Sequence, residues 1–219
     1  RLSALKEELG ARCRTAVLDV RDRKAAASLA RGLTAPFDRF NVVVAAAGLA
    51  LGLEPAAKAD MKDWEEMVAT NINGMLYTVR AFLPGLVERD EGHIILLGSV
   101  AADHPYPGGN VYGATKAFVK QFALNLRADL LGSNVRVTDV AAGLAETEFS
   151  LVRFKGDAIQ AAKPYAGIKP LSAEDVAEAI FWSVTLPRHV NVNRLELMPV
   201  MQAFGPFAFH RKPSPGPVA

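Results

Sequence analysis

Residues 98–116 read GSVAADHPYPGGNVYGATK, and this stretch joins the end of an apolar strand to the start of a long helix. Tyr112 and Lys116 are four positions apart, so on a helix their side chains lie on one face, one turn from each other. An ammonium group close to a phenol favours the phenolate, so the pair can donate and accept a proton near neutral pH. Ser99 follows the predicted strand over residues 93–97 and could hydrogen-bond the same substrate oxygen. The three side chains together can polarise a carbonyl group.

The composition is typical of one globular domain over residues 1–219, half of which are hydrophobic. The net charge is only +2 and the basic residues are scattered, so we expect no nucleic acid as a partner. The longest apolar run, residues 42–53, is shorter than the roughly 20 residues that cross a bilayer, so no membrane span is expected. Cys13 is the only cysteine, which is typical of a reducing compartment, and we expect a cytoplasmic protein.

Helix-like and strand-like segments alternate along the chain. Leucines at helical spacing predict a first helix that ends at Gly10, and the β-branched residues 15–20 read as a buried strand. The pattern then predicts a helix over 23–33, a strand over 41–47, a helix from Trp64 through Asn71 to Val79 and beyond, a strand over 93–97, a helix over 111–131, a strand over 135–140, a helix over 172–186, a strand over 194–198 and a C-terminal tail over 199–219. Such alternation predicts an α/β fold with a doubly wound parallel sheet.

Four residues fall where the predicted strands end. Asp19, Gly48, Ser99 and Gly143 all lie at carboxyl ends, where a doubly wound sheet binds its ligands. By itself, Asp19 could equally be an ordinary strand-end acceptor or a helix cap. We therefore expect the functional site at this edge of the sheet.

The motif Ser99, Tyr112-Gly-Ala-Thr-Lys116, together with Asn71 in TNINGMLY, resembles the catalytic signature of the short-chain dehydrogenase/reductase family, which has a Rossmann-like fold. The resemblance implies hydride transfer between a nicotinamide cofactor and a substrate carbon. It assigns proton exchange to Tyr112 and positioning of the substrate oxygen to Ser99. Lys116 would lower the pKa of the tyrosine and contact the nicotinamide ribose, and Asn71 would hold a water that links Lys116 to solvent.

The same resemblance implies a set of cofactor contacts. The matching positions are Asp19, Val20, Ala47, Gly48, Tyr112, Lys116, Gly143 and Thr147. The chain departs from the family pattern by having alanine at Ala45 and Ala46, in place of two asparagines, and at Ala142, in place of proline. Each asparagine hydrogen bond that is lost is worth roughly 0.5–1.5 kcal/mol, which bears on the affinity for the cofactor.

Longer segments, among them AGLALGLEPA, GHIILLGS and TEFSLVRFKGD, are similar to NADP-dependent 3-hydroxy acid dehydrogenases. This resemblance implies NADP as the cofactor and oxidation of acids such as serine and 3-hydroxypropionate at the 3-hydroxyl, with aldehyde reduction in reverse. NAD stays open, because the family residues that meet the 2′-phosphate correspond to positions upstream of Arg1. A sulfoacetaldehyde reductase, a broad carbonyl reductase and a non-catalytic oligomeric family member are alternatives, the last because of Ala45, Ala46 and Ala142.

Acid substrates need an anion anchor. Arg153 and Lys155 lie in residues 148–157, which in the family fold over the substrate as a lid, and arginine offers a bidentate fork for a carboxylate. Both could instead be solvated lid cations. His93 and His104 have no acidic, cysteine or histidine partner at metal-ligand spacing, so we expect no metal site and place both on the surface or in loops.

Two further expectations concern the whole protein. The predicted helix over 111–131 has apolar residues around its circumference, and in the family such helices pair, so we expect a homotetramer. The family fold also opens with a strand, a glycine-rich pyrophosphate turn and a second strand that do not occur in this sequence. We therefore expect about 30–45 further N-terminal residues, without which the chain would not turn over. Direct pairing of residues 15–20 with residues 41–47 would contradict this expectation.

Overall fold

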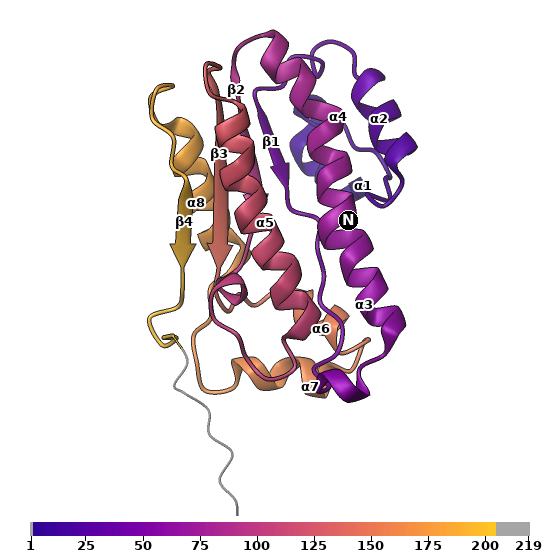
Figure 1. Cartoon of the computed structure of the whole chain (residues 1–219). Helices are drawn as coiled ribbons and strands as arrows, with labels where there is room; N and C mark the ends of the chain where they lie inside the picture. Colours follow the sequence, from indigo (N-terminus) through magenta and orange to yellow (C-terminus); the bar gives the residue numbers. More distant parts are fainter. Residues whose placement is uncertain (1, 205–219) are drawn as a thin grey trace, which may run out of the picture.

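Four parallel strands lie side by side at the centre of the molecule (Figure 1). The computed structural model describes residues 2–204. The strands follow the order β1-β2-β3-β4, with bounds β1 Val42–Ala45, β2 Gly92–Leu97, β3 Val135–Ala142 and β4 Arg194–Leu197. All of them run in the same direction, so their carboxyl ends meet at one edge of the sheet. The α/β fold with a parallel sheet is confirmed.

Helices cover both sides of the sheet: in Figure 1, α4 and α5 lie in front of the strands, and α8 lies behind β3 and β4. The α-helices are α1 Leu2–Leu9, α2 Arg23–Arg31, α3 Met61–Val68, α4 Met75–Glu88, α5 Asn110–Asp129, α6 Phe149–Arg153, α7 Ala158–Ala162 and α8 Ala173–Thr185. Short helical turns are η1 Gly10–Arg12, η2 Ala56–Lys58, η3 Ala69–Gly74, η4 Val100–Ala102 and η5 Lys163–Tyr165. Within residues 2–204, no helix combines the length and the apolar character that crossing a membrane requires.

The main core lies between α4, α5 and the sheet. Leu86 of α4, Leu126 of α5 and Ile94 of β2 are all buried in one cluster. Residues 92–96 of β2 are buried without interruption, because both faces of the strand are covered. This burial on both faces accounts for the unbroken apolar sequence of the strand.

The helix that carries Asn71 continues through three segments. Asp60 caps its start by accepting a hydrogen bond from the amide of Lys62 at 2.9 Å. The segment η3, Ala69–Gly74, is a π-helical turn between α3 and α4, and it buries Asn71. Such π turns occur often at functional sites.

Residues 15–20 do not form the predicted strand. They have no regular secondary structure up to Asp19, and Val17 is 94% exposed. A strand needs a neighbour for its backbone groups, and no described segment pairs with these residues. They do not pair with β1, which forms the edge of the sheet and exposes Val42 and Val44.

The expectation that His93 lies on the surface is wrong. It lies in β2 with 1% of its surface exposed, and its Nε2 is 2.7 Å from Thr138 Oγ1. The Thr138 hydroxyl donates its proton to the Val192 carbonyl, so Nε2 carries the imidazole proton and Nδ1 is buried without a described partner. Burial lowers the pKa of His93 to about 4.

Candidate active site

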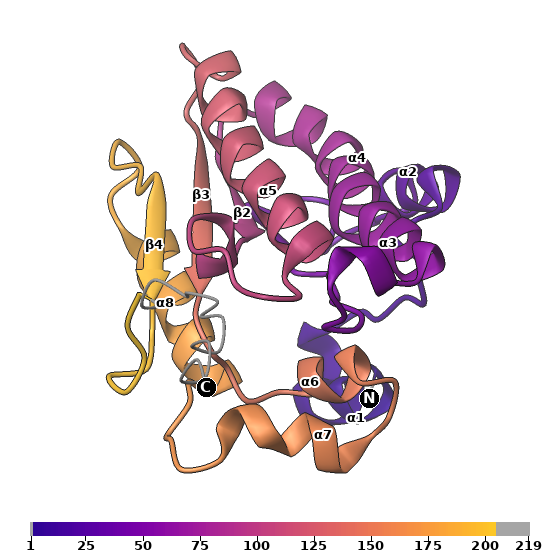
Figure 2. The same ribbon diagram turned by 60° about the horizontal axis from the view of Figure 1, so that its bottom comes forward.

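A cavity of about 630 Å³ opens at the carboxyl ends of the strands. Figures 1 and 2 place α6 and α7 beyond this edge of the sheet, and residues of α6 line the cavity. Seven of the predicted site residues line it: Gly48, Ser99, Tyr112, Lys116, Gly143, Thr147 and Arg153. The sequence therefore predicted residues that the structure brings together around one cavity, from segments that are far apart in the chain.

Ser99 and Tyr112 meet at the junction of β2 and α5. The Ser99 hydroxyl donates to the Ala142 carbonyl at 3.3 Å and accepts from the Ala101 amide at 3.1 Å, which caps η4. Burial raises the pKa of Tyr112, while a hydrogen bond with Ser99 lowers it. Ser99 is thus in place to share a proton with the phenol.

Lys116 lies one turn beyond Tyr112 on α5, as the spacing predicts. Its Nζ is 5.8 Å from the centre of the Tyr112 ring and donates a 2.7 Å hydrogen bond to the Leu97 carbonyl. Burial lowers the pKa of Lys116 to about 8. The described contacts use one of its three N–H donors, which leaves the others for a ligand.

The expected lowering of the tyrosine pKa is not what the structure gives. The pKa of Tyr112 is raised, because the loss of solvent around the phenol outweighs the favourable charges. Among the cations, Arg153 is the one that opposes this rise. The Lys116 ammonium is directed to the Leu97 carbonyl instead of the phenol oxygen.

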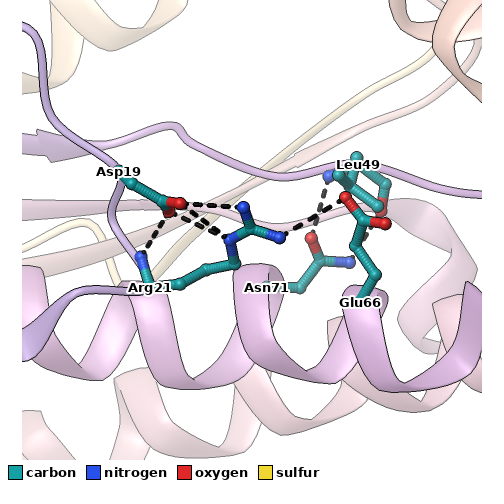
Figure 3. A network of polar contacts seen from close by, with 5 residues as sticks. All are labelled: Asp19, Arg21, Leu49, Glu66 and Asn71. Atoms are coloured by element: carbon teal, nitrogen blue, oxygen red, sulfur yellow. Dashed lines mark hydrogen bonds and ion pairs between the residues drawn. The ribbon is translucent and has the colours of Figure 1, made fainter. Parts of the chain in front are cut away.

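Asn71 connects the loop after β1 to α5. Its Oδ1 accepts from the Leu49 amide at 2.8 Å, and its Nδ2 donates to the Leu49 carbonyl at 2.8 Å, as Figure 3 shows. The second Nδ2 proton goes to Thr115 Oγ1 at 3.0 Å, and Thr115 donates to the Tyr112 carbonyl at 2.8 Å. Both side-chain donors of Asn71 are occupied, so a water bound by this residue would need one of its carbonyl oxygens. Thr115, between the two motif residues, is a site residue that the sequence analysis missed.

Gly48 gives the cofactor side of the cavity its space. A Cβ at this position would lie 3.3 Å from Asn71 Oδ1 and 3.6 Å from Lys116 Nζ. The glycine thus leaves open the space in front of the unused Lys116 donors. Ala47 does not line the cavity, whereas its neighbours Ala46 and Gly48 do. These donors, and the open backbone beside them, fit the nicotinamide end of a dinucleotide.

Arg153 lies among three aromatic rings. Its guanidinium carbon is 5.0 Å from the ring centre of Tyr112, 5.1 Å from that of Phe149 and 5.8 Å from that of Tyr106. Its Nη2 donates to the Tyr106 hydroxyl at 2.8 Å, while its Nε is buried without a described partner. The sequence analysis missed Tyr106 and Phe149, although both stand close to predicted site residues in the chain.

Lys155 does not belong to the cavity. Its Nζ forms a 2.8 Å ion pair with Asp63 on the outer surface, and 59% of its side chain is exposed. Binding of substrate by Lys155 therefore has no support in the structure. Lys155 is the solvated cation that the sequence analysis kept as an alternative.

Asp19 and Val20 also lie outside the cavity. Figure 3 shows Asp19 bound to Arg21, 2.8 Å away, and Arg21 extending to Glu66 at 3.6 Å. The hydrogen bonds from Arg21 hold the pKa of Asp19 at about 2. Val20 packs on Gly74, where a Cβ would approach its Cγ2 to 2.7 Å. Asp19 and Val20 thus contact other parts of the chain, and their contact with a cofactor stays a prediction.

No group of three or more metal-binding side chains occurs within the part of the chain that the structure describes. His104 does lie in a loop, as expected, but it lines the cavity, with its ring 4.4 Å from that of Phe204. The polar side chains that line the cavity include the Ser99 and Tyr112 hydroxyls, the Lys116 ammonium and the Arg153 guanidinium.

Comparisons with known proteins agree with this geometry. A family model for short chain dehydrogenases matches residues 1–156. The chain is 56% identical over 212 residues to the NADP-dependent 3-hydroxy acid dehydrogenase YdfG of Salmonella typhi, covering 96% of this chain and 86% of the relative. It is 55% identical over 214 residues to sulfoacetaldehyde reductase 2 of Chromohalobacter salexigens, covering 96% and 85%. A solved structure, the closed form of serine dehydrogenase complexed with NADP+, superposes with a TM-score of 0.94 at 54% identity, covering 96% of this chain and 86% of that one. The chain belongs to the short-chain dehydrogenase family.

Proposed function

We propose that the protein is an NADP-dependent dehydrogenase that oxidises the 3-hydroxyl of small hydroxy acids such as serine and 3-hydroxypropionate, and reduces the aldehydes in reverse. The observation that carries this proposal is the position of Arg153, whose guanidinium lies 5.0 Å from the Tyr112 ring in the same cavity as Ser99 and Lys116. A proton-transferring phenol beside an arginine suits a substrate that has both a hydroxyl group and an acid group. The relatives named as a 3-hydroxy acid dehydrogenase and a serine dehydrogenase, at 56% and 54% identity, support the same activity.

NADP, when bound, supplies the hydride acceptor at nicotinamide C4. In oxidation Tyr112 removes the hydroxyl proton of the substrate, and in reduction it returns that proton to the carbonyl oxygen. Ser99 orients the same oxygen through its hydroxyl. Because burial raises the pKa of Tyr112, little phenolate is present at neutral pH. More phenolate forms as the pH rises, so we expect oxidation to become faster toward alkaline pH.

Arg153 would hold the acid group of the substrate. Its guanidinium carbon lies within 5.1 Å of the Tyr112 and Phe149 ring centres, and its Nε has no hydrogen-bond partner among the described residues. A carboxylate accepts two such donors in one plane, which fixes the distance from the acid group to the reacting hydroxyl. The anchor thus selects small acids over uncharged alcohols.

A sulfoacetaldehyde reductase is the second candidate, because a guanidinium binds a sulfonate as well as a carboxylate, and a relative at 55% identity has that name. Kinetics with serine, 3-hydroxypropionate, sulfoacetaldehyde and uncharged aldehydes separates the two activities and a broad carbonyl reductase. The highest kcat/KM for a 3-hydroxy acid supports the proposal, and the highest value for sulfoacetaldehyde or for uncharged aldehydes contradicts it. A non-catalytic member would give no saturable NADPH fluorescence.

A homotetramer in the cytoplasm is part of the proposal. Phe118 on α5 is 37% exposed, and Phe181 and Trp182 on α8 are 63% and 51% exposed, which favours burial against further copies. The free thiol of Cys13 is consistent with a reducing compartment. The hydrophobic sequence of residues 198–209 is a second reason to expect the tetramer, and its residues 205–209 lie outside the described residues. The single domain stays a prediction.

A further inference from the structure

A cluster of charged side chains lies behind the active site, between α5, β3, β4 and the turn after Ser99. Its members are Asp103, Lys120, Asp139, Arg194 and Glu196. Asp103 forms ion pairs with both Lys120 and Arg194, and Arg194 also lies 2.9 Å from Glu196. The mechanism above uses none of these groups.

Asp139 differs from the other members of this cluster. It is 2% exposed, and neither of its carboxylate oxygens accepts a hydrogen bond from a described residue. Its nearest cation is Arg194, whose Nε lies 3.4 Å from Oδ2. A buried carboxylate without hydrogen bonds destabilises the fold unless nearby opposite charges compensate for its own charge.

The carboxylate of Asp139 lies directly against the backbone of β2. A Cβ at Gly98 would clash with its Oδ1, so only glycine allows this approach. Gly98 stands between Leu97, whose carbonyl holds the Lys116 ammonium, and Ser99. Asp139 is thus separated from the catalytic groups by a single glycine.

Among the described cations around Asp139, Lys116 is the one that forms no ion pair with another carboxylate. Lys116 and Lys120 face it from α5, Arg194 and Glu196 from β4, and Asp103 from the turn after η4. Lys120 and Arg194 are already paired with Asp103, whereas the only described hydrogen-bond partner of Lys116 is a neutral carbonyl. Burial lowers the pKa of Lys116 to about 8, and the charge of Asp139 opposes that fall. The pKa of Asp139 is itself raised to about 6 by burial, so at neutral pH both groups are charged.

We propose that Asp139 is a positioning residue that keeps Lys116 in its charged form, acting from behind the active site across Gly98. The kinetic consequence rests on the proposed function, in which the Lys116 ammonium donates its remaining N–H groups to the cofactor beside Tyr112. The electrostatic effect itself does not depend on the reaction.

The test compares two variants that each remove one carboxylate from the same cluster. Asp139→Asn keeps the shape of the buried side chain and removes its charge, and Asp103→Asn is the matched control, because Asp103 pairs with Lys120 and Arg194. Loss of the Lys116 charge should end the alkaline rise in kcat/KM for oxidation as a falling limb, and for Asp139→Asn we expect this limb to move to lower pH by about one unit. Asp103→Asn should leave this limb within about 0.3 units of wild type, a shift small beside that of an adjacent opposite charge.

A second measurement follows the Lys116 amine directly, by NMR of the 15N-lysine-labelled protein without cofactor. The Lys116 resonance should titrate at lower pH in Asp139→Asn and at the wild-type pH in Asp103→Asn. Asp139→Ser removes the charge without adding volume and serves where the asparagine variant does not fold. Unchanged titration of Lys116 in a folded variant overturns the inference. A shifted titration in a protein that oxidises no hydroxy acid supports the inference and contradicts the proposed function.

Discussion

The guanidinium carbon of Arg153 lies 5.0 Å from the ring centre of Tyr112, so this cation lies directly beside the phenol that we propose as the proton-exchanging group. Arg153 comes from α6 and Tyr112 from α5, and Tyr106 holds the arginine in place through a 2.8 Å hydrogen bond. The same guanidinium can therefore influence the phenol and bind the acid group of a substrate.

Replacement of Arg153 by alanine should raise the KM for 3-hydroxy acids by about 10–100-fold, because a hydrogen bond to a charged group is worth about 1.5–3 kcal/mol. The KM for uncharged aldehydes should change little. Steady-state kinetics with both substrate classes measures the difference. Lys155→Ala is the matched control from the same lid, since Lys155 pairs with Asp63 outside the cavity, and it should leave both values unchanged. Equal effects of Arg153→Ala on acids and aldehydes would make Arg153 a residue of lid structure only.

Loss of the Asn71 side chain should destabilise the protein by about 2–4 kcal/mol, because three hydrogen bonds to Leu49 and Thr115 disappear. Urea unfolding of Asn71→Ala at neutral pH gives this number, and kcat should fall as well. Thr115→Ser keeps the hydroxyl that Asn71 binds, whereas Thr115→Val removes it. Equal stability and activity of Thr115→Ser and Thr115→Val would show that the hydrogen bond from Asn71 to α5 is unimportant.

The buried His93 predicts a loss of stability in acid. Its pKa is about 4 in the folded protein, against the ordinary value of 6.5, so between these pH values the unfolded chain binds a proton that the folded chain does not. Stability is complete above pH 6.5, and about 3 kcal/mol is lost as the pH falls to about 4. Asp139, whose pKa is raised to about 6, acts in the opposite direction over part of this range.

The difference between wild type and His93→Gln isolates the histidine, because Asp139 is present in both. Urea unfolding at pH 7 and pH 5 should show a smaller acid-induced loss in the variant. The same loss in both proteins would mean that His93 is protonated in the folded state.

The oligomeric state is expected to be a homotetramer. Phe118 on α5 and Trp182 on α8 are exposed in the single chain, and their burial between copies is the physical reason for this expectation. Light scattering at micromolar concentration should give four times the mass of the chain, and Phe118→Glu should lower that mass. A wild-type monomer at this concentration would contradict the expectation.

The sequence predicted how Tyr112 and Lys116 lie relative to each other because their relation is local, one turn of a helix. It placed Ser99, Gly48 and Gly143 at the cavity because parallel strands share one carboxyl edge. Contacts between distant elements were not readable in the same way. The sequence contains no sign that Lys155 pairs with Asp63.

Two further errors have the same origin. Residue type alone favours the surface for His93, but the apolar strand around it buries it against Thr138. Residues 15–20 have the composition of a strand, yet a strand forms only where another lies beside it, and none of the described segments does. Side-chain chemistry was thus predictable wherever backbone geometry was local, and uncertain wherever a tertiary partner decided it.

The most direct test of the proposed function is the formation of NADPH from NADP and L-serine or 3-hydroxypropionate, followed by absorbance, in wild type and Tyr112→Phe. The phenylalanine keeps the ring beside Arg153 and removes only the hydroxyl group, which carries the transferable proton. Wild type should turn over, and the variant should lose turnover while NADPH affinity and the thermal midpoint stay nearly unchanged. Activity of Tyr112→Phe within about tenfold of wild type would contradict the account, since positioned acid–base groups contribute about 10²–10⁴-fold.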